Sequence, residues 1–121
     1  MYELSIKSDF AASHCLGHGY EGKCKNLHGH TWQVEIIIQS QTLDGVGMVI
    51  DFMEIKKRLK SFLEELDHTH LNDHPFFKKR NPTTENLAKY IFEQFSKTCR
   101  PLKIKKVTVW ESLHASVTYY K

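Results

Sequence analysis

Four segments of the chain alternate apolar and polar residues, which is the pattern of a β-strand with one buried face. They are residues 2–10, 31–41, 103–111 and 115–120. In the first segment Leu4, Ile6 and Phe10 share one face, and in the second Trp32 begins a similar apolar row. The pattern therefore predicts four strands, two towards each end of the chain.

Two segments between these strands repeat apolar residues at helical spacing. The first helix is predicted over residues 52–66, with Asp51 as its N-cap and Glu54 completing a reciprocal capping box. The second helix begins at Thr83 or Thr84 and ends before the proline that precedes the third strand. An irregular segment, residues 67–82, separates the two helices and carries three histidines.

The predicted order is β-β-α-α-β-β, which favours an α+β fold with a four-stranded antiparallel sheet and two helices packed on one face. A chain of 121 residues is enough for one core, so residues 1–121 are expected to form a single domain. The sheet edges stay unpaired in one chain. We therefore expect neighbouring subunits to cover them in a homo-oligomer.

The composition is that of a soluble globular protein, with 40% hydrophobic and 26% charged residues. No apolar run is long enough to span a membrane, and the first residues lack a signal-peptide pattern. Three irregularly spaced cysteines do not suggest a disulfide framework, so we expect a cytoplasmic protein with free thiols. The net charge of +3 suits an anionic small molecule, whereas the lysines form no aromatic-interleaved patch for nucleic acid.

Histidine is the unusual component, because seven of the eight histidines lie between His14 and His74. His28 and His30 stand at the entry to the second strand, where residues i and i+2 project to the same face. Pairing of the first two strands would bring His14 close to them. Three neutral imidazoles with an open fourth position are typical of catalytic zinc. Taken alone, the short His-x-His pair is equally compatible with a polar strand end.

Cys24 lies four residues before His28 and between Lys23 and Lys25. A thiol near a bound cation and flanked by lysines ionises more readily and can act as a general base or nucleophile. The alternatives are a small buried side chain or a fourth, structural zinc ligand. We assign Cys15 and Cys99 to packing.

Two further groups carry potential chemistry. Asp67 and His68 follow the first helix, and a carboxylate can hold the tautomer of a neighbouring imidazole and raise its basicity. Two solvated polar residues would give the same pattern. Glu111 ends an apolar strand, so it is either exposed or an anchor that accepts two hydrogen bonds from a guanidine-like edge, such as that of a pterin.

Six motifs, in order along nearly the whole chain, resemble those of the 6-pyruvoyltetrahydropterin synthase family of the tunnelling-fold superfamily. They are Phe10-Ala11-Ala12-Ser13-His14, Cys24-x-x-Leu27-His28-Gly29-His30, Gly47-Met48-Val49-Ile50-Asp51-Phe52, Leu66-Asp67-His68-x-x-Leu71-Asn72, Asn81-Pro82-Thr83-Thr84-Glu85-Asn86, and Glu111. The resemblance implies a sheet that closes into a barrel with those of other subunits, with active sites at subunit contacts, and a hexamer as a dimer of trimers.

The short Cys-x-x-Leu-His-Gly-His form is most similar to the 6-carboxy-5,6,7,8-tetrahydropterin synthases of queuosine (7-deazaguanine) biosynthesis. That likeness implies conversion of 7,8-dihydroneopterin triphosphate to 6-carboxytetrahydropterin, acetaldehyde and triphosphate. It also implies a role for each matching residue: zinc ligands His14, His28 and His30; a proton-abstracting Cys24; a second acid–base pair, Asp67 with His68; a pterin anchor, Glu111; and pterin-ring contacts from Thr83 and Thr84.

Three features depart from the family pattern or are not explained by it. His18 and Cys15 add potential metal ligands beside His14, and residues 112–115 are less polar than the turn expected after the anchor. No motif marks the triphosphate site, for which exposed lysines are the candidates. Two alternatives stay open: a 6-pyruvoyltetrahydropterin synthase with the same machinery, and a non-catalytic zinc module in which Cys24 closes a structural site.

Overall fold

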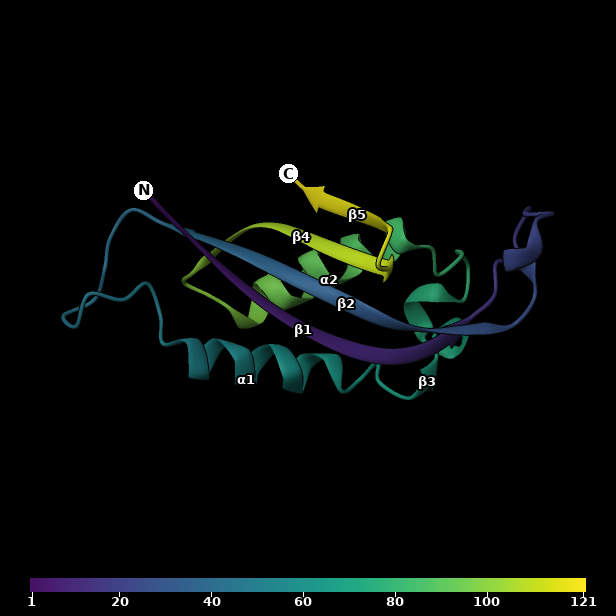
Figure 1. The fold of residues 1–121 in the computed structure, drawn as a ribbon, viewed down its shortest axis with the longest axis horizontal. Coiled ribbons are helices and arrows are strands. Elements are labelled where there is room, and N and C mark those ends of the chain that lie inside the picture. The colour runs from purple at the N-terminus through teal and green to yellow at the C-terminus, as the bar shows by residue number, and fades with distance from the viewer.

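The computed structural model describes residues 1–121 and contains one five-stranded sheet (Figure 1). The strands are β1 (Tyr2–His14), β2 (His28–Ser40), β3 (Thr69–His70), β4 (Lys103–Ser112) and β5 (Ala115–Tyr120). Their order across the sheet is β3-β1-β2-β4-β5. The four long strands pair antiparallel, as the alternating patterns predicted.

The prediction of a purely antiparallel, four-stranded sheet was wrong in one respect. The two-residue β3 pairs parallel to the end of β1, with Ala12 opposite Thr69 and Ser13 opposite His70. Two residues are too short to give a recognisable period, so the sequence pattern could not reveal this strand. It matters for the site because it holds the segment after the first helix against β1.

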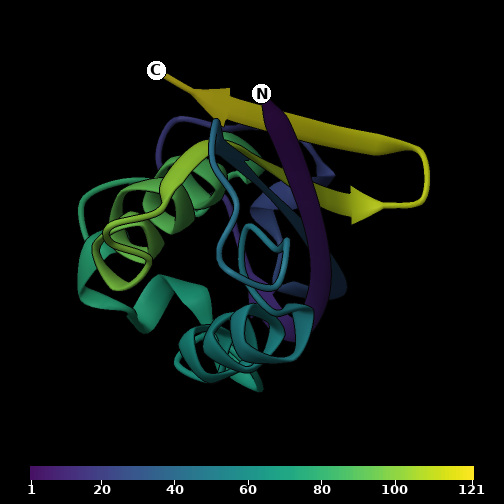
Figure 2. The ribbon, with the colours of Figure 1, turned by 90° about the vertical axis from the view of Figure 1, so that its left-hand side faces the viewer.

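Two helices pack on one face of the sheet, α1 (Phe52–Leu63) over β1 and α2 (Thr84–Thr98) over β4 and β5 (Figure 2). Asp51 caps α1 as predicted, accepting a hydrogen bond from the Met53 amide at 2.8 Å. The capping box is incomplete, because the Glu54 carboxylate pairs with Arg58 one turn later instead. The helix also ends at Leu63 rather than at residue 66, as the chain turns towards β3.

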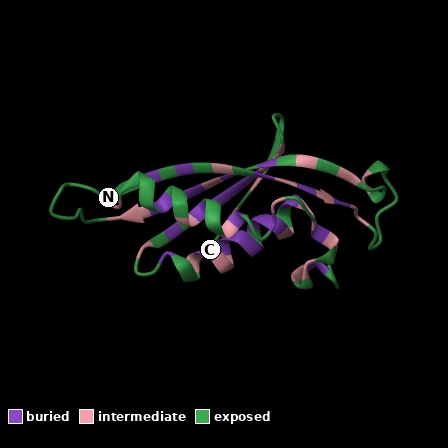
Figure 3. Cartoon of the chain, turned by 90° about the horizontal axis from the view of Figure 1, so that it is seen from below, coloured by how far each residue is buried: buried purple, intermediate pink, exposed green.

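A single core cluster fills the space between the sheet and the helices, and buried positions alternate along the strands (Figure 3). In β1 the inward row continues from Leu4 and Ile6 through Phe10 and Ala12 to His14. In β2 the inward row runs back from the buried Trp32 to His30 and His28. The apolar rows therefore lead directly into a group of histidines at one end of the sheet.

None of the helices is long and apolar enough to cross a membrane.

Candidate metal centre

The pairing of β1 with β2 brings the three predicted metal ligands together. His14 lies directly opposite His28, and His30 lies opposite Ala12, one pleat further along the same face. The Nε2 atoms of His14 and His28 are 2.9 Å apart, and the three rings meet edge to face at centroid separations of 4.5–5.1 Å. Both strands are longer than predicted, so the histidines belong to the rigid sheet.

Backbone carbonyls fix the tautomer of two of these rings. His14 Nδ1 lies 2.8 Å from the Pro82 carbonyl oxygen, and His28 Nδ1 lies 2.7 Å from that of Asn26. A carbonyl oxygen only accepts, so each Nδ1 carries the proton and each neutral ring keeps a lone pair on Nε2. The two lone pairs face each other, an arrangement that a shared cation would stabilise.

The third ring has an unsatisfied nitrogen. His30 Nε2 is buried without a hydrogen-bond partner, and although Glu111 Oε1 lies 2.9 Å away, it does not meet hydrogen-bond geometry. Burial lowers the pKa of both His14 and His30, and the neighbouring imidazoles add to this effect. The rings are therefore kept neutral, which is the state in which imidazole binds metals.

Trp32 forms the floor beneath the histidines. Its indole is fully buried and packs edge to face against His14 and His30 at 4.9 and 5.1 Å. Its Nε1–H donates to the Ala12 carbonyl at 3.2 Å. A rigid apolar floor of this kind limits how far the rings can turn away from one another.

Glu111, at the end of β4, completes the cluster. Its carboxylate and the three imidazoles offer ligand atoms that all lie within 4.8 Å of one another. One oxygen faces His30, and the other accepts a 3.0 Å hydrogen bond from the buried Thr84 hydroxyl at the start of α2. The sequence left open whether Glu111 is exposed or a ligand anchor, and the structure shows a half-buried carboxylate that is hydrogen-bonded to Thr84.

These four residues fit a zinc ion on the evidence of their donor atoms. Three imidazole nitrogens converge; the other nitrogen of His14 and of His28 contacts a carbonyl, and His30 Nε2 is buried without a hydrogen-bond partner. A carbonyl that accepts from the outer ring nitrogen in this way orients zinc-bound histidines in proteins. Three histidines with one further position suit a catalytic site, and a carboxylate in that position would give a closed one.

Cys24 lies outside this cluster, on the short helical turn Lys23–Lys25 between β1 and β2. Its thiol is free and half-buried, and its carbonyl accepts a 2.9 Å hydrogen bond from the Leu16 amide. Cys15 and the exposed His18 also lie outside the group of convergent ligands. The structure therefore does not add either of them to the metal site.

Asp67 and His68 form the predicted pair, with Asp67 Oδ2 at 3.0 Å from His68 Nδ1. Both are tied to β1: Asp67 Oδ1 accepts from the Ala11 amide at 2.8 Å, and the His68 amide donates to the Ala11 carbonyl at 2.6 Å. The Ala11 bond is the main cause that lowers the pKa of Asp67. His68 adopts a positive φ of 57°, and its side chain is 83% exposed.

The two threonines predicted to contact the pterin ring make different hydrogen bonds. Thr83 caps α2, its hydroxyl accepting from the Asn86 amide at 3.1 Å. Thr84 donates to Glu111. Thr84 thus belongs to the cluster directly, and Thr83 sets the start of the helix that carries it.

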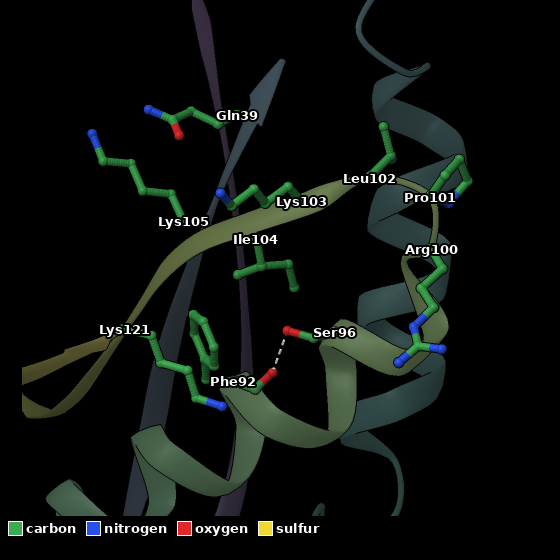
Figure 4. A pocket seen from close by; sticks show the side chains of 10 residues that line it. All are labelled: Gln39, Phe92, Ser96, Arg100, Pro101, Leu102, Lys103, Ile104, Lys105 and Lys121. Carbon is green, nitrogen blue, oxygen red and sulfur yellow. Dashed lines mark hydrogen bonds between the residues drawn. The ribbon is translucent and has the colours of Figure 1, made fainter.

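Two hollows differ in their relation to the cluster. One, of about 420 Å³, lies on the sheet between β1, β2 and β3 and includes His30 and His68 in its lining. The other, of about 570 Å³, lies at the opposite end of β4 (Figure 4). Arg100, Lys103 and Lys121 line it together with Phe92 and Ile104. Of these two hollows, only the first is lined by candidate site residues.

Comparisons with known proteins agree with the fold. A family profile described as "6-pyruvoyl tetrahydropterin synthase" matches residues 3–121. A 6-carboxy-5,6,7,8-tetrahydropterin synthase of Synechocystis sp. is 34% identical, over 99% of this chain and 94% of its own. A dihydroneopterin monophosphate aldolase of Pyrococcus furiosus is 36% identical, over 72% of each chain. The 6-pyruvoyl tetrahydropterin synthase of Caenorhabditis elegans superposes with a TM-score of 0.88 at 28% identity, covering 99% of this chain and 95% of that one.

The fold and the site are thus those of a class of α+β enzymes in which a histidine cluster lies at one end of the sheet. The chain belongs to the 6-pyruvoyl tetrahydropterin synthase family, as its six motifs predicted.

Proposed function

We propose that this protein is a zinc-dependent 6-carboxy-5,6,7,8-tetrahydropterin synthase acting on 7,8-dihydroneopterin triphosphate in queuosine biosynthesis. The observation that carries the proposal is the convergence of the His14, His28 and His30 nitrogens on one point next to the Glu111 carboxylate. Support for the product comes from the Cys-x-x-Leu-His-Gly-His spacing and from the similarity to the Synechocystis enzyme.

In this proposal His14, His28 and His30 hold the zinc, and Glu111 binds the pterin. Zinc bound there would act as a Lewis acid towards side-chain oxygens of the substrate. The Glu111 carboxylate can accept two hydrogen bonds from the amino-pyrimidine edge of a pterin, and Thr84 keeps one of its oxygens oriented. The anchored ring then presents its side chain to the metal site, which is the positioning part of the catalysis.

In this proposal Cys24 and the Asp67–His68 pair carry out the proton transfers. The Cys24 thiolate takes a proton from the substrate side chain at Sγ. Asp67, whose pKa is lowered chiefly by the Ala11 amide, stays ionised and accepts from His68 Nδ1. His68 Nε2 is then the atom free to take up or give back a proton.

A neighbouring subunit is proposed to complete the site. The outer edge of β5 and the part of β1 beyond β3 have no partner strand in the chain, and unpaired edges invite pairing with another copy. His68 is also too exposed to be enclosed by its own chain. We propose a barrel of several sheets, with a hexamer as a dimer of trimers, in the cytoplasm.

The test is to identify the product formed from 7,8-dihydroneopterin triphosphate by mass spectrometry, with dihydroneopterin monophosphate as a second substrate. The proposal expects 6-carboxytetrahydropterin and acetaldehyde from the triphosphate. Accumulation of the pyruvoyl product alone would replace it with a 6-pyruvoyltetrahydropterin synthase. Turnover of the monophosphate alone would replace it with the activity named for the Pyrococcus relative.

A further inference from the structure

Two asparagines make the same unusual contact with the segment that precedes Cys24. Asn72 Oδ1 accepts from the Cys15 amide at 2.9 Å while its Nδ2 donates to the Cys15 carbonyl at 2.8 Å. Asn81 does the same with His18, at 3.0 and 2.9 Å. A primary amide carries one acceptor and one donor side by side, so it pairs with a backbone residue as a strand would. We call these contacts the two amide clasps.

The residue that is hydrogen-bonded to Cys24 lies between the two clasped residues. Leu16 lies between Cys15 and His18, and its amide donates to the Cys24 carbonyl at 2.9 Å. This part of the chain extends beyond the end of the sheet (Figure 1). Both clasps span more than 50 residues of sequence, so they fasten the loop to the body of the protein.

The second clasp is built on residues 81–86, the segment that leads into α2 and also contacts the rest of the site. Within it, Asn86 Nδ2 donates to the Asn81 carbonyl at 2.8 Å, and Thr83 caps α2. The Pro82 carbonyl accepts from His14 Nδ1, and Thr84 donates to Glu111. The segment of residues 81–86 therefore contacts the loop that carries Cys24, the candidate metal ligand His14 and the Glu111 carboxylate.

We propose that Asn81 and Asn72 are positioning residues that fix Cys24 relative to the histidine cluster, through the Cys15–His18 backbone. The inference rests on the proposed function, because it assigns Cys24 the role of base. A catalytic base must lie within hydrogen-bond reach of the proton it removes, and a displacement of about 1 Å can cost roughly 100-fold in rate. Loosening either clasp should therefore slow the chemistry without removing zinc or weakening pterin binding.

The test compares Asn81→Asp with Asn72→Asp, using Gln41→Ala as the control for loss of an exposed side-chain amide. Aspartate keeps the size and the acceptor but replaces the donor with an oxygen that faces a carbonyl, so each clasp loses half of its contact. We expect kcat to fall roughly 10- to 100-fold with KM and zinc content unchanged. Hydrogen exchange should accelerate in the peptide covering residues 15–25 and stay unchanged in β2. Gln41→Ala should match the wild type.

A wild-type kcat in both aspartate variants would overturn the inference, and so would loss of zinc or a rise in KM that accounts for the lost rate. If one variant fails to fold, the other still decides the outcome. Exchange and zinc content do not depend on turnover, so they report on the clasps even if the wild-type protein makes no 6-carboxytetrahydropterin. Absence of that product from the wild type alone would count against the proposed function, not against the clasps.

Discussion

At the residue scale, a nitrogen atom without a hydrogen-bond partner indicates the candidate metal site as clearly as the contacts between side chains do. His30 Nε2 is buried without a partner, which normally costs about 1–3 kcal/mol. The Nε2 atoms of His14 and His28 face each other at 2.9 Å. Such a group is stable once the three nitrogens share a cation. The sequence correctly predicted that these three histidines converge, because strand pairing and the i, i+2 rule fix their positions.

Replacing Cys24 separates a catalytic role from a structural one. In Cys24→Ala we expect a folded protein with full zinc content and a kcat lower by about 100- to 10,000-fold, since a general base contributes that much. Zinc analysis, a thermal melt and the product assay measure the three quantities. Cys99→Ala removes a thiol far from the site and should keep its kcat per folded molecule. Loss of zinc and of structure in Cys24→Ala would support the structural zinc module instead.

Replacing Glu111 separates a pterin anchor from a fourth metal ligand. The anchor role predicts that Glu111→Gln keeps its zinc but raises KM roughly 10- to 100-fold, because charge-assisted hydrogen bonds to the substrate are lost. Zinc affinity and KM are measured on the same preparation. A large drop in zinc affinity with an unchanged KM would show that the carboxylate serves the metal, as its proximity to the imidazoles would also allow.

At the scale of elements, periodic segments were predictable and contacts between distant segments were not. Alternation located the four long strands and helical spacing located both helices, but β3 is too short to carry a period. The partners of Asp67 and His68, both on Ala11, depend on that strand. The same holds for the amide clasps, because an asparagine gives no sign in sequence of the backbone it will bind.

Hydrogen bonds among Glu65, His74 and Tyr90 link the turn that follows α1 with helix α2. They should make the free energy of unfolding depend on pH. The Tyr90 hydroxyl donates to Glu65 Oε1 at 2.5 Å, and His74 Nε2 lies 2.6 Å from the same oxygen. The Tyr90 bond is the main cause that lowers the pKa of Glu65 below its ordinary 4.5. Its stabilisation is thus full above pH 4.5 and is lost as the pH falls through the lower, folded value.

Tyr90→Phe should therefore lower the free energy of unfolding by about 1 kcal/mol at pH 7, a figure reduced because Glu65 is half exposed. The difference from the wild type should shrink as the pH falls below 4.5 towards 3. Urea unfolding at several pH values measures it, and Tyr2→Phe, at an exposed position, is the matched control. A difference that stays constant across this pH range would exclude Glu65 as the cause.

At the scale of the whole molecule, the candidate site residues differ in how far the single chain covers them. The histidine cluster and Glu111 lie on β1, β2 and β4 next to the start of α2, whereas His68 faces outwards and two sheet edges are open. Assembly would cover the edges and enclose the Asp67–His68 pair. These features are consistent with the tunnelling fold that the sequence motifs implied, but the number of subunits follows from surfaces that no periodic pattern describes.

The central claim is that zinc held by His14, His28 and His30 is required for conversion of the pterin triphosphate. The most direct test is to remove metal from the purified protein with a chelator, return zinc in measured amounts, and follow 6-carboxytetrahydropterin formation against zinc bound per chain. The account predicts no activity without metal and a linear rise that ends at one zinc per chain. Full activity in the metal-free protein would contradict it.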